Sequence, residues 1–164
     1  MTVFSTFCEV IRGLATGYFT DGLILHLFAY GTLMCPEIMA RVVTSLPASL
    51  PARLDHYRRG PLSGVDYPAI VACPGGCVEG LLYLDLPEAA WRRLDEFEAE
   101  IYTRKEVTVS LADDRRLAAE TYVLKDEYRR RLGPSAWSFE EFLKSAKARF
   151  TKEYGNFPQP TPKG

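Results

Sequence analysis

The stretch LILHLFAYGTL, residues 23–33, decides the fold because it joins a buried strand to an abrupt exit from that strand. Leu23 to Tyr30 are almost all apolar and are bounded by Gly22 and Gly31. A run this short between glycines predicts a strand buried on both faces. Pro36 suits the first turn of a helix, so we expect Glu37 to Val43 to be helical.

The turn between this strand and this helix, Tyr30-Gly31-Thr32-Leu33, is a candidate binding loop. Main-chain N–H groups at a strand-to-helix turn can face one point and bind a carboxylate or an oxyanion. Gly31 permits a close backbone approach, and Thr32 adds a hydroxyl group. The alternative is a tight turn with a packed Tyr30 and no ligand.

Downstream, the pattern predicts a hairpin. Residues 67–72 and 78–84 are strand candidates, and Pro74-Gly75-Gly76 between them is a turn signal. The connection from Pro47 to Gly60 is expected to contain a further strand.

The last part of the domain is predicted to hold two strands and a helix. The strands run from Tyr102 to Leu111 and from Arg116 to Val123, joined at Asp113-Asp114. Ser138, with Glu141 three residues later, predicts the start of the final helix.

Another helix has a clear start signal. Asp85 is expected to cap it, Pro87 suits its first turn, and Glu88 completes a capping box. The helix is then expected to run through Glu98.

Glu98 is the unusual residue of that helix. At 100° per residue, Trp91, Leu94 and Glu98 lie within one arc of about 60°, so Glu98 points where the core side chains point. Burial of a carboxyl group is costly and raises its pKa, which suits a general acid or base. The alternative is a structural glutamate paired with an arginine such as Arg104.

Composition and charge exclude some classes of protein. The chain has 164 residues, which suits one domain, and a net charge of −1, which favours neither nucleic acid nor an anionic membrane as a partner. No stretch reaches the roughly 18 apolar residues of a spanning helix, and no signal peptide is recognised, so we expect a cytoplasmic protein. We expect an extension over residues 1–22, one domain over 23–155 and a loose tail over 156–164.

The four cysteines predict neither a metal site nor a disulfide. Cys73 and Cys77 are the one close pair, and the two histidines have no neighbouring ligand. We expect reduced thiols, two of them flanking the predicted hairpin turn.

The order of several short motifs resembles the γ-glutamylcyclotransferase-like family, which includes γ-glutamylamine cyclotransferases and the avirulence-induced proteins of plants. The resemblance covers about residues 24–124. The similar segments are Phe28–Leu33, Tyr67–Ile70, Val78–Tyr83, Leu94–Glu98, Tyr102-Thr103-Arg104 and Tyr122-Val123. It implies an α+β fold, with a small mixed barrel-like sheet and packed helices. Many members have glycine after the matching glutamate, whereas this chain has Ala99.

The resemblance implies an enzyme that cyclises a small γ-glutamyl amide to 5-oxoproline and releases an amine or amino acid. Glu98 is implied as the general acid and base, and the loop Tyr30, Gly31, Thr32 and Leu33 as the substrate-binding segment. Tyr67, Tyr102 and Arg104 are further candidates for substrate binding. For Arg104 a structural ion pair is an equal alternative. No metal or cofactor is implied.

The sequence leaves the leaving group and the oligomeric state open. Two alternative functions remain: a binding or regulatory protein on the same fold, and an enzyme that removes a γ-glutamyl protecting group in biosynthesis. The C-terminal helix is a candidate cover for the pocket.

Overall fold

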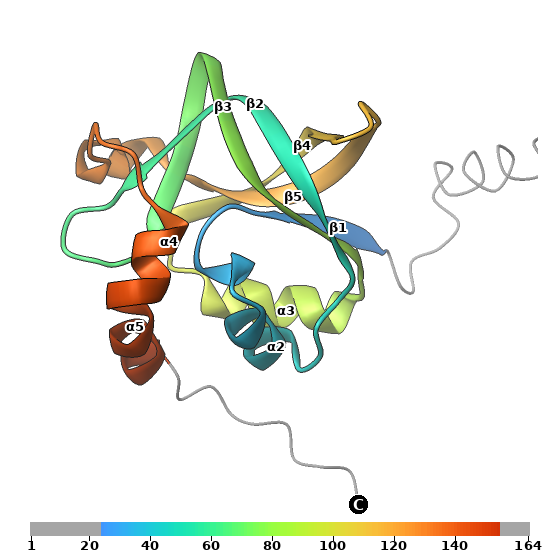
Figure 1. The fold of residues 1–164 in the computed structure, drawn as a ribbon, viewed down its shortest axis with the longest axis horizontal. Helices are drawn as coiled ribbons and strands as arrows, with labels where there is room; N and C mark the ends of the chain where they lie inside the picture. The colour runs from blue at the N-terminus through green and yellow to red at the C-terminus, as the bar shows by residue number, and fades with distance from the viewer. Residues whose placement is uncertain (1–23, 155–164) are drawn as a thin grey trace, which may run out of the picture.

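The computed structural model describes residues 24–154, with side chains through residue 152. Five strands form a closed barrel in the order β1-β3-β2-β4-β5 (Figure 1). Their bounds are β1 Leu25–Ala29, β2 Ser49–Pro61, β3 Pro68–Leu86, β4 Tyr102–Leu111 and β5 Arg116–Leu124. Strand β1 pairs with β3 antiparallel and with β5 parallel, which closes the barrel.

Two apolar cores stabilise this arrangement. One fills the barrel and includes Phe28, Ile70 and Val109. The other lies between the sheet and the helices and includes Met39 and Leu94. Helices α2 (Pro36–Val43) and α3 (Glu88–Phe97) lie side by side below β1 in Figure 1. The predicted strand before Gly31, the strand in the connection from Pro47 and the helix from Pro36 are therefore confirmed.

The predicted hairpin is wrong. Residues 68–86 form the single strand β3, and both of its arms pair with β2: Ala72 lies opposite Tyr57 and Cys77 lies opposite Asp55. Residues 73–76 form a bulge between these pairs, where β3 bends sharply in Figure 1. Gly75 has φ +80° there, and a Cβ on Gly76 would collide with the Tyr57 carbonyl oxygen. The glycines thus permit a bulge that sequence alone does not distinguish from a turn.

The predicted cap of α3 is also wrong. Asp85 belongs to β3 with φ +57°, and α3 begins at Glu88 after Pro87 with no side-chain cap. The Asp85 N–H donates instead to Nδ1 of His26 at 3.1 Å, which ties it to β1. The helix ends one residue earlier than predicted, so Glu98 follows it as the C-cap.

The C-terminal elements follow the prediction more closely. Strands β4 and β5 form the predicted hairpin. The Ser138 hydroxyl accepts the N–H of Glu141 at 3.2 Å and so caps α4 (Phe139–Glu141). A π-helical turn, η3 (Phe142–Ala146), follows and leads into α5 (Lys147–Tyr154).

The expected extension over residues 1–22 and the expected tail over 156–164 lie outside the described residues. In the described part of the chain, no helix is both long and apolar enough to cross a membrane.

Candidate active site

A pocket lies between the loop after β1 and the end of α3. Seven of the eight predicted site residues line it: Tyr30, Gly31, Thr32, Leu33, Tyr67, Glu98 and Tyr102. The other lining residues are Leu27, Phe28, Ala29, Pro68, Phe97, Ala99, Tyr122 and Phe150. The wall is therefore mostly aromatic and aliphatic, with one carboxyl group among these side chains. Since Phe150 belongs to α5, the C-terminal helix contributes to the wall as expected.

After β1 ends at Ala29, Tyr30 and Gly31 lead into the 3₁₀ turn η1 (Thr32–Met34). The Met34 N–H donates to the Gly31 carbonyl at 3.0 Å, and the Cys35 N–H to the Thr32 carbonyl at 3.1 Å. The first N–H groups of such a turn, here those of Thr32 and Leu33, have no acceptor inside the turn itself. Gly31 is needed because a Cβ there would lie 2.8 Å from Cγ of Pro68.

Glu98 is half-buried as a residue because it borders the pocket. Burial of its carboxyl group, together with a smaller effect of the nearby Asp95 carboxylate, raises its pKa to about 8. A carboxyl group with this pKa exchanges protons close to neutral pH, as a general acid and base requires.

Hydrogen bonds to the main chain fix two tyrosine walls. The Tyr30 hydroxyl donates to the Tyr122 carbonyl, and the Tyr102 hydroxyl donates to the Pro68 carbonyl, each at 2.7 Å. Burial raises the pKa of both tyrosines well above the ordinary value, so both hydroxyls stay protonated and remain donors. These rings shape the pocket rather than supply a base.

Arg104 lies outside this pocket. Its guanidinium pairs with Asp95 at 3.3 Å and with Glu120 at 4.0 Å, and it stacks over Trp91 at 4.9 Å. Arg104 lines a neighbouring polar cavity that Glu98 also borders. Arg104 therefore forms a structural ion pair, as one alternative expected, but its partners are Asp95 and Glu120 rather than Glu98.

Three features of the site were missed in the sequence. The Tyr122 hydroxyl donates to Asp95 at 2.7 Å, which connects β5 to the helix that carries Glu98. Phe97 packs against Phe150 and narrows the pocket. Arg59 donates to the Tyr30 carbonyl at 2.6 Å. Strand periodicity around residue 59 could indicate that the Arg59 side chain points into the barrel. This signal becomes usable only once the register of β2 is known.

Metal ligands do not gather in the described part of the chain. No group of three or more His, Cys, Asp and Glu side chains in that part is placed to hold a metal ion. Cys35, Cys73 and Cys77 are free thiols, and the last two flank the bulge of β3 rather than a hairpin turn.

The barrel and its helices define a class of protein. The structure superposes on a solved γ-glutamyl cyclotransferase with a TM-score of 0.57, at 16% identity, over 86% of this chain and 92% of that one. It superposes on an Arabidopsis thaliana protein, solved in solution, with a TM-score of 0.65, at 24% identity, over 90% and 97% of the two chains. The α+β fold is thus the γ-glutamylcyclotransferase fold.

Sequence comparison gives the family. A family model described as "Gamma-glutamyl cyclotransferase, AIG2-like" matches residues 27–139. AIG2-like protein C of Arabidopsis thaliana is 35% identical over 125 residues, which are 76% of this chain and 72% of that protein. The chain belongs to the AIG2-like γ-glutamyl cyclotransferase family, which confirms the resemblance seen in its motifs.

Proposed function

We propose that this protein is a cytoplasmic γ-glutamylcyclotransferase-type enzyme that acts on a small γ-glutamyl amide or γ-glutamyl amino acid. The observation that carries the proposal is the Glu98 carboxyl group, which borders an aromatic pocket opposite the Gly31 loop with its pKa raised to about 8. No cofactor takes part in the proposed reaction.

The reaction is intramolecular. The α-amine of the γ-glutamyl group attacks its own γ-carbonyl carbon, a C–N bond closes the five-membered 5-oxoproline ring, and the original amide C–N bond breaks. The amine gives up a proton, and the leaving nitrogen gains one. Because nucleophile and electrophile belong to one molecule, holding the folded conformer is the main task of the pocket. The rigid walls of Tyr30 and Tyr102 suit that task.

Glu98 is assigned the proton transfers. A carboxylate whose conjugate acid has a pKa of about 8 is a much stronger base than an ordinary glutamate, so it is suited to take a proton from the substrate α-ammonium group. The protonated carboxyl group then donates this proton to the leaving nitrogen, and the resulting carboxylate accepts the second proton, which the attacking nitrogen loses as the ring closes and which passes on to the released amine. The N–H groups at the start of η1 are assigned to the substrate α-carboxylate or to the developing oxyanion.

The test is a panel of γ-glutamyl amino acids and γ-glutamyl amines incubated with the purified protein, with 5-oxoproline and free glutamate measured by mass spectrometry. We expect 5-oxoproline from at least one substrate and a loss of at least about 100-fold in Glu98→Gln. Glu96→Gln is the matched control, because Glu96 is an exposed glutamate of the same helix.

Other outcomes identify the alternatives. Release of glutamate without 5-oxoproline would indicate hydrolytic removal of a γ-glutamyl group. Binding of panel members with neither product would indicate a binding protein. Full activity in a folded Glu98→Gln protein would reject the assignment of Glu98.

A further inference from the structure

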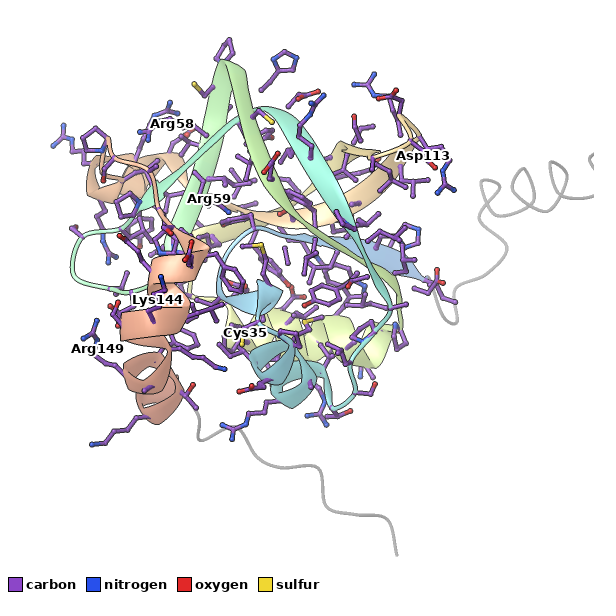
Figure 2. All side chains as sticks on the ribbon, in the orientation of Figure 1. Cys35, Arg58, Arg59, Asp113, Lys144 and Arg149 are labelled. Atoms are coloured by element: carbon purple, nitrogen blue, oxygen red, sulfur yellow. The ribbon has the colours of Figure 1, made fainter. Side chains whose placement is uncertain are left out.

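Arg59 is a charged residue at an inward-facing position of the barrel. It lies in β2 directly opposite Ile70 of β3, and Ile70 is fully buried in the barrel core. Directly opposed residues of an antiparallel pair project from the same face of the sheet. In the view of Figure 2, Arg58 lies nearer the outline of the molecule than Arg59 does.

The contacts of Arg59 meet at the start of the substrate loop. Its Nη1 donates to the carbonyl oxygen of Tyr30 at 2.6 Å and lies 3.3 Å from that of Glu79. Its guanidinium stacks over the ring of Trp137, with 5.4 Å between the guanidinium carbon and the ring centroid. Hydrogen bonds from a charged donor are stronger than neutral ones, so the bond to Tyr30 is the principal restraint on that carbonyl.

The two carbonyls lie where β1 and β3 separate. The last register pair of these strands is Ala29 opposite Leu81. Tyr30 directly follows Ala29, Glu79 lies two residues before Leu81 in β3, and one arginine nitrogen bridges their carbonyls. Arg59 therefore replaces the strand ladder at the place where β1 becomes the loop.

Holding the Tyr30 carbonyl also orients the next N–H group. The Tyr30–Gly31 peptide is trans, so its C=O and N–H point in opposite directions. Gly31 has no side chain of its own to hold this peptide plane. Fixing the carbonyl on the Arg59 side directs the Gly31 N–H away from Arg59 and sets the chain direction into η1.

We propose that Arg59 is the positioning residue of the substrate loop, and that it orients the main-chain N–H groups of residues 31–33 toward the γ-glutamyl substrate. This inference rests on the proposed function for its kinetic consequence, but not for its structural one. Lysine cannot replace Arg59 fully, because it lacks the planar group that donates to a carbonyl and stacks on Trp137 together.

The experiment compares Arg59→Met and Arg59→Lys with Arg58→Met. Arg58 is a matched control, since it is the preceding residue of β2 and donates to a different carbonyl, that of Gly133, at 3.1 Å. The first measurement is the ¹⁵N–¹H amide spectrum without substrate. We expect Arg59→Met to shift the amide resonances of Gly31 and Thr32 and to leave the resonances of β4 and β5 unchanged. We expect Arg59→Lys to shift them less and Arg58→Met not to shift them.

The second measurement is the rate of 5-oxoproline release. We expect kcat/KM to fall about 100-fold in Arg59→Met, to recover in part in Arg59→Lys, and to stay within about twofold in Arg58→Met. A loss in kcat would indicate that the loop N–H groups bind the developing oxyanion. A rise in KM would indicate that they bind the substrate carboxylate. Either supports the positioning role.

The proposal is overturned if Gly31 and Thr32 keep their resonances in the Arg59 variants, or if Arg59→Met loses no more kcat/KM than Arg58→Met. If Arg59→Met does not fold, the amide resonances and the kcat/KM of Arg59→Lys decide the question by the same two criteria. If the wild-type protein forms no 5-oxoproline, the proposed function fails, and the amide spectrum still decides whether Arg59 orients the loop.

Discussion

Glu98 and Asp95 are three residues apart and have different surroundings. Glu98 borders an aromatic pocket, whereas Asp95 is bound by the Tyr122 hydroxyl and the Arg104 guanidinium and is exposed over 47% of its side chain. Burial dominates the raised pKa of Glu98, and the charge of Asp95 adds to it. Asp95 thus sets part of the proton affinity of Glu98 without lining the aromatic pocket itself.

Neutralising Asp95 is expected to move the pH dependence of activity. Asp95→Asn removes a negative charge beside Glu98, so the pKa of Glu98 falls and the acid limb of the kcat/KM profile shifts to lower pH. Arg104→Gln leaves the Asp95 charge without its partner and shifts the limb to higher pH. Profiles from pH 5 to 10 would measure both. Shifts of the same sign, or a comparable shift in Glu96→Gln, would contradict this account.

Glu98 also links stability to pH. Its pKa is about 8 in the folded protein and about 4.3 in an unfolded chain, so the folded state binds the proton more tightly. The contribution of Glu98 to the stability of the folded state is therefore fully present below about pH 4 and declines as the pH rises to 8. Glu98→Gln removes this decline. We expect the variant to be more stable than wild type by roughly 2–4 kcal/mol at pH 9 and by little at pH 4.5. Urea denaturation at the two pH values measures this, and an equal difference at both would contradict it.

At the scale of elements, β3 shows how far local patterns reach. The sequence locates both of its arms, yet a Pro-Gly-Gly segment between two apolar runs is equally compatible with a turn and with a bulge. The register with β2 resolves the choice, because each arm already has a partner and the arms cannot pair with each other. The same register turns Arg59 toward the barrel interior and the Tyr30 carbonyl.

Gly76→Ala is a test of this bulge. A Cβ at this position would collide with the Tyr57 carbonyl, which is backbone and cannot move aside without disturbing β2. We expect a loss of about 1–3 kcal/mol in the free energy of unfolding, measured by urea denaturation. Pro74→Ala, at an exposed position of the same bulge, should change it by less than about 0.5 kcal/mol. A tolerated Gly76→Ala would indicate an open turn instead.

At the scale of the whole molecule, barrel closure assembles the site. The parallel pair β1 and β5 brings Tyr30 to Tyr122, β4 supplies Tyr102, and α5 supplies Phe150. The buried Thr121 hydroxyl of β5 donates to the Phe28 carbonyl of β1 at 2.8 Å and so fastens the closing pair.

Thr121→Val is expected to weaken this closure. Valine has the same shape but leaves the Phe28 carbonyl without its donor in a buried place, which costs about 1–3 kcal/mol. The midpoint of urea unfolding measures the loss. Thr108→Val on the exposed face of β4 is the control and should be nearly neutral. Equal effects of the two changes would show that the Thr121 bond does not stabilise the barrel.

The sequence by itself determined the strand of residues 25–29, the glycine loop after it, the helices that begin at Pro36 and Ser138, and the inward direction of Glu98. These follow from periodicity and from glycine, proline and capping residues, which act over one or two turns of chain. The tertiary structure alone decided the continuity of β3, the position of Asp85 inside it, and the partners of Arg59 and Arg104. Those features depend on strand register and barrel closure, which bring together residues far apart in the chain, and no local pattern encodes such distances.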